Sequence, residues 1–190
     1  VPDFLVEILA RFTRALRESD AVDQRSGVSA RFAIAAQETI AAAALHRASI
    51  RGEDDAVARL VDVESAVEVL GGKIEFESGE EGREWDILDY TLRTSTAETL
   101  RATLRTLDFN PLIAALDGSV TISTGASVSA KDFLAGLPDL GETTLYDDIA
   151  KAFNADSEGS RANAIELALE GLFLSRKIAK DSGEGETIYG

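Results

Sequence analysis

The chain has 190 residues, of which 34 are acidic and 19 basic, giving a net charge of −15, and 45% are hydrophobic. Such an acidic surface repels phosphate backbones and anionic lipid headgroups, so nucleic acid and membranes are excluded as partners. With no cysteine and one histidine, the chain can build no disulfide framework and no thiolate or histidine-cluster metal site. We therefore expect a cytoplasmic protein. Because the chain begins at Val1 and has no methionine, we also expect it to be a fragment of a longer protein.

The pattern along the chain is mainly helical. Apolar residues recur at helical spacing in residues 4–17 and 85–107. Caps, alanine-rich runs and breakers indicate further helices over residues 30–49, 63–70, 110–116, 130–137, 144–153 and 160–180. In chain order, we expect Ser29 to cap the second of these helices, Asp62 the third, and Ser157 or Ser160 the last. The hydroxyl-rich residues 94–96 mark a weak point in the fourth.

Two further segments have the pattern of extended chain. Residues 73–78 alternate between charged and apolar side chains, which predicts a short strand. Residues 118–128 are rich in β-branched and small residues and indicate an extended segment or a hairpin arm. Whether the two pair in a small sheet stays open. The tail from about residue 181 is polar and glycine-rich, and we expect it to be mobile.

These elements suggest two helical parts. The composition changes around residues 108–119, where small and β-branched residues replace the leucine-rich pattern. We expect a helical bundle over residues 1–107 and a second helical lobe over residues 108–190. The predicted fold class is therefore mainly α, with at most a small β element.

No motif for self-contained catalysis is present. The chain lacks a Gly-x-x-x-x-Gly-Lys-Ser/Thr phosphate loop and a Gly-x-Ser-x-Gly nucleophile motif. Residues 154–165 resemble a calcium loop in their first half, but Ile165 stands where a bidentate glutamate is needed. We expect no catalytic residue and no metal ligand. We expect His46 to pack at a helix–helix contact and Trp85 to anchor the core.

The residues before the second helix are the most informative. Arg31 falls in the first turn of that helix, where the macrodipole disfavours a cation unless an anion faces it. Backbone N–H groups and a guanidinium that point the same way form a site for phosphate or carboxylate. The competing interpretation is a small-residue turn that carries a surface arginine.

This run, DQRSGVSAR over residues 23–31, leads into a helix that ends Leu45-His46-Arg47-Ala48. It resembles the lid region of magnesium chelatase-type AAA+ ATPases, where a Gly-x-Ser-x-Arg arrangement carries the second sensor arginine. Residues 71–77, GGKIEFE, resemble the segment that follows that lid. Residues 169–177, LEGLFLSRK, resemble the family's C-terminal helix.

The resemblance implies a role for each residue of the turn. Arg31 would reach the γ-phosphate of ATP held by the large domain or by a neighbouring subunit of a ring. Gly27 would allow the tight turn, Ser29 would cap the helix that aims Arg31, and Arg25 is a second candidate for contact with phosphate or a subunit. ATP and Mg²⁺ would be bound by the full-length parent and not by this fragment, which lacks the Walker motifs.

Two functions of different classes follow. The leading one is the C-terminal lid and extension of a magnesium chelatase-like AAA+ ATPase, inactive alone, which contributes to nucleotide sensing and ring assembly. Its partners would be the ATPase large domain, neighbouring subunits, and a von Willebrand-type or other protein. The alternative is a stand-alone acidic helical adaptor that binds a protein partner and never meets nucleotide. An enzyme that acts on small molecules through acidic side chains is a weaker third option.

Overall fold

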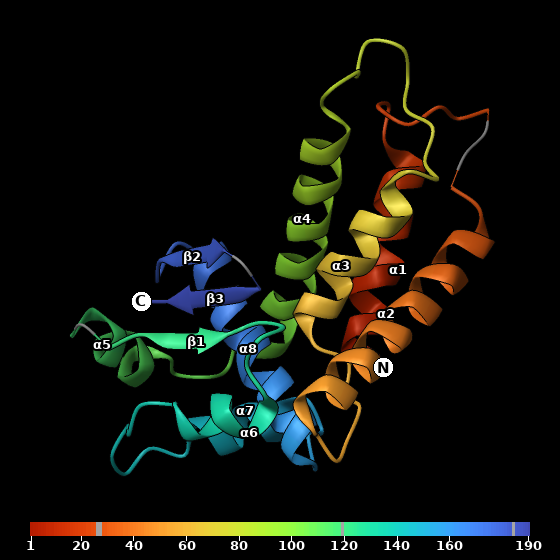
Figure 1. Cartoon of the computed structure of the whole chain (residues 1–190). Helices are drawn as coiled ribbons and strands as arrows, with labels where there is room; N and C mark the ends of the chain where they lie inside the picture. The colour runs from red at the N-terminus through yellow and green to blue at the C-terminus, as the bar shows by residue number, and fades with distance from the viewer. Residues whose placement is uncertain (26–27, 119, 184) are drawn as a thin grey trace.

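A computed structural model describes residues 1–25, 28–118, 120–183 and 185–190, and these residues form eight helices and three short strands (Figure 1). The helices are α1 (Asp3–Glu18), α2 (Ala30–Arg51), α3 (Leu60–Gly71), α4 (Glu84–Leu104), α5 (Asn110–Asp117), α6 (Ala130–Ala135), α7 (Leu145–Ala152) and α8 (Glu158–Leu174). The strands are β1 (Ile122–Thr124), β2 (Lys180–Gly183) and β3 (Glu186–Tyr189). The fold is mainly α with a small β element, as the sequence predicts.

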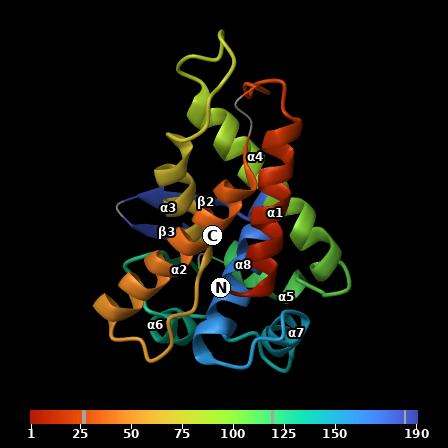
Figure 2. The same ribbon diagram turned by 90° about the vertical axis from the view of Figure 1, so that its right-hand side faces the viewer.

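Helices α1 to α4 run alongside one another in the first part of the chain (Figures 1 and 2). Helix α1 packs against α4 and α2, and α3 packs against α2. The helical spacing of Leu5, Ile8, Phe12 and Leu16 explains the position of α1, because these side chains form one face that is fully buried. In the described parts of the chain, no helix combines the length and apolar character needed to cross a membrane.

Helix α8 is the centre of the second part. Its residues are buried almost continuously from Gly159 to Glu170, because α4, α6, α7 and α3 all contact it. Ser157 and Ser160 begin this helix together: the Ser157 hydroxyl accepts a hydrogen bond from the Ser160 N–H, and the Ser160 hydroxyl accepts one from the Ser157 N–H. Both serines that were predicted as alternative caps thus take part in capping α8. The helix ends at Leu174, earlier than expected.

The described residues of the tail lie in a small sheet, an element that the sequence did not predict there; the expected mobility of the tail stays a prediction. Strands β2 and β3 form an antiparallel hairpin, and β1 adds to it in the order β1-β3-β2. Ile122 pairs with Tyr189, and both side chains are buried at 1% and 2% exposure. The polar tail thus places one aromatic side chain, that of Tyr189, in the core.

Residues 73–78 do not form a strand of that sheet. They make a single antiparallel bridge, between Val22 and Phe76. The extended segment around β1 therefore pairs with the C-terminal hairpin and not with residues 73–78. Both neighbours of Phe76 also bond across the bridge: the Asp23 N–H donates to the Glu75 carbonyl, and the Glu77 N–H donates to the Ala21 carbonyl, each at 2.9 Å.

Helix α4 has no break at residues 94–96. The hydroxyls of Thr91, Ser95 and Thr99 each donate to the carbonyl four residues earlier, at 2.6, 2.8 and 2.9 Å. Ser95 and Thr96 are buried at 3% and 2% exposure. The Ser95 hydroxyl at the predicted weak point is thus satisfied within the helix and does not compete with its backbone bonds.

The start of α3 also differs from expectation. The helix begins at Leu60, so Asp62 lies inside its first turn and is not the residue before it. The Asp62 carboxylate still caps the helix, because it accepts a hydrogen bond from the Arg59 N–H at 2.8 Å.

The proposed division at residue 108 stays a prediction. Contacts cross it in several places: α4 packs on α8, and the rings of Phe4 and Phe153 meet edge to face at 4.9 Å between centroids. One cluster of buried apolar side chains includes residues from both sides of the boundary.

Candidate functional site

The start of α2 carries the residues that the sequence singles out. Ser29 occupies the N-cap position with extended backbone, as expected, but its side chain makes no capping hydrogen bond. Arg31 lies in the first turn, exposed, and has no ion-pair or hydrogen-bond partner for its side chain among the described residues. Gly27 and Ser26 lie outside the described residues. The helix start is fixed from α1, where Arg17 Nε donates to the Val28 carbonyl at 2.5 Å.

Arg25 has a different environment. Its side chain is 89% exposed and forms an ion pair with Asp23, with Nε 3.3 Å from Oδ1. The hydrogen bond and charge of Asp23, together with the charge of Glu77, raise the pKa of the Arg25 guanidinium. Since Arg25 already has an anionic partner and Arg31 has none among the described residues, Arg31 is the better placed of the two to bind an external anion.

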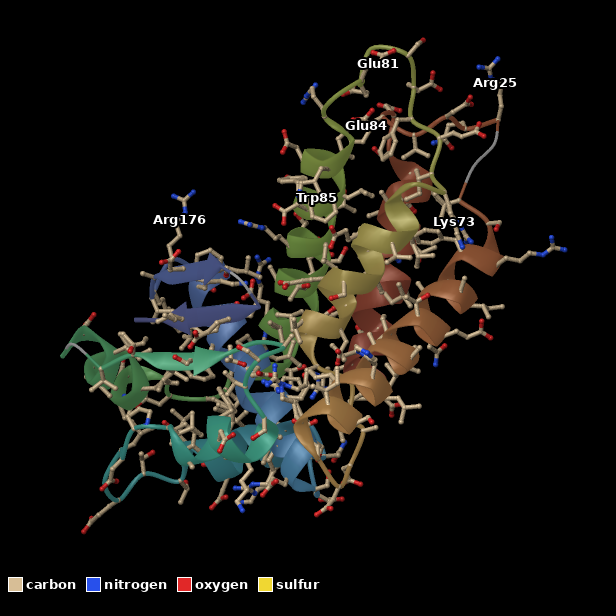
Figure 3. The ribbon with its side chains drawn as sticks, viewed as in Figure 1. Arg25, Lys73, Glu81, Glu84, Trp85 and Arg176 are labelled. Atoms are coloured by element: carbon tan, nitrogen blue, oxygen red, sulfur yellow. The ribbon has the colours of Figure 1, made fainter. Side chains whose placement is uncertain are left out.

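The fold brings together two of the segments that carry the family resemblance. Residues 21–23 and 75–77 lie side by side through the Val22–Phe76 bridge and its two flanking hydrogen bonds. The chain after α1 and the chain after α3 therefore meet at one end of the helical bundle. Arg25 and Lys73 both lie at this end, with Glu81 on the neighbouring loop, whereas Arg176 lies far from them, above the hairpin (Figure 3).

A cavity of about 720 Å³ opens at the same end. Its apolar lining comes from Ile74, Phe76, Leu88 and Trp85, whose side chain is 54% exposed and does not anchor the core as expected. Its charged lining consists of five carboxylates and one cation: Asp23, Glu68, Glu77, Glu81, Glu84 and Arg25. Glu81, Glu84 and Trp85 follow one another along the loop and first turn of α4 (Figure 3).

This excess of negative charge decides what the cavity can accept. Carboxylates raise the free energy of a bound phosphate, so the cavity is unsuited to a nucleotide. A cationic side chain beside an exposed indole ring would be attracted both by the carboxylates and by the ring face. Arg31 is not among its lining residues, so the cavity and the arginine are separate features.

A buried ionic cluster, which was not predicted from the sequence, lies between the two parts of the chain. Arg59 is 1% exposed and bonds to both carboxylate oxygens of Glu166, to Thr124 Oγ1 at 2.9 Å and to the Val128 carbonyl at 2.6 Å. Burial lowers the pKa of its guanidinium, but the charges of Glu166 and nearby carboxylates outweigh that effect and raise it.

Arg47 belongs to the same cluster. It is 5% exposed and pairs with Glu53 at 2.6 Å and with Asp62 at 3.1 Å. A signal existed in the sequence, because Arg47 follows Ile40 and Ala44 at the spacing of one buried helix face. His46 lies off that face and is exposed, so its expected packing at a helix contact is wrong.

A second buried group joins the hairpin to α8. The Tyr189 hydroxyl donates to Glu170 Oε2 at 2.6 Å, and Lys180 Nζ donates to the same oxygen at 2.8 Å. Lys180 also lies 5.6 Å from the centre of the Phe173 ring. Every charge in this group has a partner, which is the pattern of a structural cluster and not of a reactive site.

The described residues contain no group of three or more histidine, cysteine or acidic side chains arranged to hold a metal ion. No protein-family model, curated protein or solved structure matches the chain.

Proposed function

We propose that this chain is the lid and C-terminal extension of a magnesium chelatase-type AAA+ ATPase, and that Arg31 contacts the γ-phosphate of ATP bound by the large domain or a neighbouring subunit. The observation that carries the proposal is an exposed guanidinium in the first turn of α2, without a partner among the described residues. A cation at that position is disfavoured by about 0.3–1 kcal/mol unless an anion faces it. An external phosphate would supply that anion.

The surrounding contacts support this role. Arg17 holds the Val28 carbonyl one residue before the N-cap Ser29, which fixes the direction in which α2 starts. Guanidinium suits phosphate because it stays charged and presents a planar pair of donors. Arg25 ranks second, because Asp23 already pairs with it, and Gly27 would provide the turn between the two arginines.

ATP and Mg²⁺ belong, in this proposal, to the complete protein, and the chain alone has no activity. The protein would be cytoplasmic and work as a ring whose lid couples nucleotide state to subunit contacts. A von Willebrand-type or other protein would receive the resulting movement.

The test is the variant Arg31→Ala in the protein encoded by the whole reading frame. We expect ATP turnover to fall by roughly 100-fold, because a donor to the developing phosphate charge is removed, while the circular dichroism spectrum stays unchanged. Arg14→Ala is the matched control, since Arg14 is also exposed and has no partner among the described residues. Unchanged turnover in Arg31→Ala would reject the assignment.

The alternative, a protein-binding adaptor, is favoured by the acidic cavity around Trp85, which fits a basic segment of a partner. The two functions are separated by the reading frame upstream of Val1. A phosphate loop within about 250 residues, the span of one such domain, supports the ATPase. A start codon immediately before Pro2 supports the adaptor.

A further inference from the structure

A second cavity is lined by residues of α4 and α8 and by the residues that follow each helix. The two helices pack against one another, and their ribbons can be followed in Figures 1 and 2. The volume of the cavity is about 250 Å³. Its floor is apolar and is formed by Leu100, Leu104, Phe109 and Leu172. The two helices approach closely at Gly171, where an added Cβ would lie 3.3 Å from Leu100 Cδ1. The cavity therefore has a rigid apolar floor.

The charged lining of this cavity is entirely cationic. Arg101 lies in the last turn of α4, Arg105 is the C-cap residue of that helix, and Lys177 follows the end of α8. All three are exposed, and none has an ion-pair or side-chain hydrogen-bond partner within the described ranges. No carboxylate is among the residues that line the cavity, although the chain as a whole carries a net charge of −15.

The helix ends do not neutralise these cations. The C-termini of α4 and α8 contribute roughly −0.5 charge each, which offsets about one of the three positive charges. Arg101 and Arg105 are also spaced i,i+4, where like charges repel by about 0.2–0.5 kcal/mol. A bound anion would remove this repulsion. The chain thus keeps a local positive field directly above an apolar floor.

We propose that this cavity binds a segment of a partner protein in which one large apolar side chain is flanked by aspartate or glutamate. The apolar side chain would enter the floor, and the carboxylates would pair with Arg101, Arg105 and Lys177. A volume of about 250 Å³ is below the roughly 300–1,000 Å³ of typical small-molecule pockets and suits a single anchoring side chain. The proposal does not depend on nucleotide sensing by Arg31.

The experiment measures fluorescence anisotropy with an acetylated, fluorescein-labelled peptide that has a central phenylalanine between glutamates. We expect saturable binding that weakens about tenfold or more in the double variant Arg101→Gln/Arg105→Gln, and also weakens from low salt to about 0.5 M NaCl. Ala97→Leu, which fills the cavity from a half-buried position in α4, should weaken binding about as much without changing charge.

Matched controls distinguish peptide binding at this cavity from nonspecific attraction between charges. The double variant Arg14→Gln/Lys131→Gln removes the same charge from exposed cations elsewhere and should bind as the unmodified chain does. Peptides with lysines in place of the glutamates, or alanine in place of the phenylalanine, should not bind. Absence of saturable binding at about 1 mM peptide, or equal affinity in the Arg101/Arg105 double variant, would overturn the proposal. Competition by octanoate as strong as that of the peptide would reassign the cavity to a small amphipathic anion.

Discussion

Tyr189, the penultimate residue, connects the hairpin to α8 through one hydrogen bond. Its hydroxyl donates to Glu170 at 2.6 Å, and its side chain is 2% exposed. Burial raises the pKa of the phenol, and the negative charge of Glu170 raises it further. The folded chain therefore holds the Tyr189 proton at a pH where the unfolded chain releases it.

This difference predicts a dependence of stability on pH. At pH 8, Tyr189→Phe should lower the free energy of unfolding by about 1.5–3 kcal/mol, because a hydrogen bond to a charged carboxylate is lost. The contribution of Tyr189 is fully present below about pH 10, where the phenol of the unfolded chain ionises. Above that pH it should fall by about 1.4 kcal/mol per unit, because the unfolded state then binds fewer protons. Urea unfolding between pH 8 and pH 11 measures both effects.

Tyr90→Phe supplies the control for this series. Tyr90 is 72% exposed, so the substitution should leave the free energy of unfolding at pH 8 within about 0.5 kcal/mol of the unmodified value. If Tyr189→Phe and the unmodified chain lose stability in parallel above pH 10, the phenol is not the group responsible.

At the scale of residues, the sequence predicted where a residue lies along a helix better than whether its side chain is buried. Ser29 and Arg31 stand where the pattern placed them, because a helix start depends on neighbours in the chain. Trp85 is exposed although tryptophan is usually largely buried, and Arg47 is buried although arginine is usually exposed. Burial depends on which distant helix packs on a given face, and a single periodic pattern does not specify that partner.

At the scale of elements, the helices were predictable and the hairpin was not. Helix α1 carries a clear apolar periodicity in its own sequence, and α5 begins with the Asn-Pro pair that marks a helix start. Strands β2 and β3 have little alternation, and three of the four residues of β2 are exposed. Strand β2 pairs only with β3, and β3 in turn pairs with β1, whose residues precede their partners by 63 to 67 positions, as in Thr124–Thr187 and Ile122–Tyr189. Such long-range pairing leaves no local signal.

Gly125, directly after β1, allows the backbone to pass close to the hairpin, which leads to a prediction for the sheet. Its φ is +116°, and an added Cβ would lie 2.5 Å from the Gly185 carbonyl oxygen. Gly125→Ala therefore forces two backbone segments apart, and we expect it to lower the melting temperature and to increase amide hydrogen exchange in β1 and β3. Thermal unfolding and exchange measured by mass spectrometry would record both changes.

Gly52→Ala is the matched substitution. Gly52 also has positive φ, +67°, but no atom lies within 4 Å of its added Cβ. Its cost should be limited to the left-handed backbone, about 1–2 kcal/mol, with exchange in the sheet unchanged. An equal loss of stability in both variants would show that the contact with Gly185 is unimportant.

At the scale of the whole molecule, buried charge links the two parts of the chain. Arg59, at the start of α3, bonds to Glu166 in α8 and to Thr124 in β1. Glu53 accepts a hydrogen bond from the Ala130 N–H at 2.8 Å, at the start of α6. The division at residue 108, inferred from composition, thus separates segments that satisfy each other's buried polar groups.

We therefore predict that residues 1–107 and 108–190 unfold together. Arg59→Leu leaves the Glu166 carboxylate buried without its cation, which should cost about 3–5 kcal/mol. Arg93→Leu, which removes an exposed pair with Asp89, should cost less than about 1 kcal/mol. Calorimetry should give a single transition in all three proteins, shifted strongly only by Arg59→Leu. Two transitions, of which one is not shifted by Arg59→Leu, would instead show that the two parts unfold as independent domains.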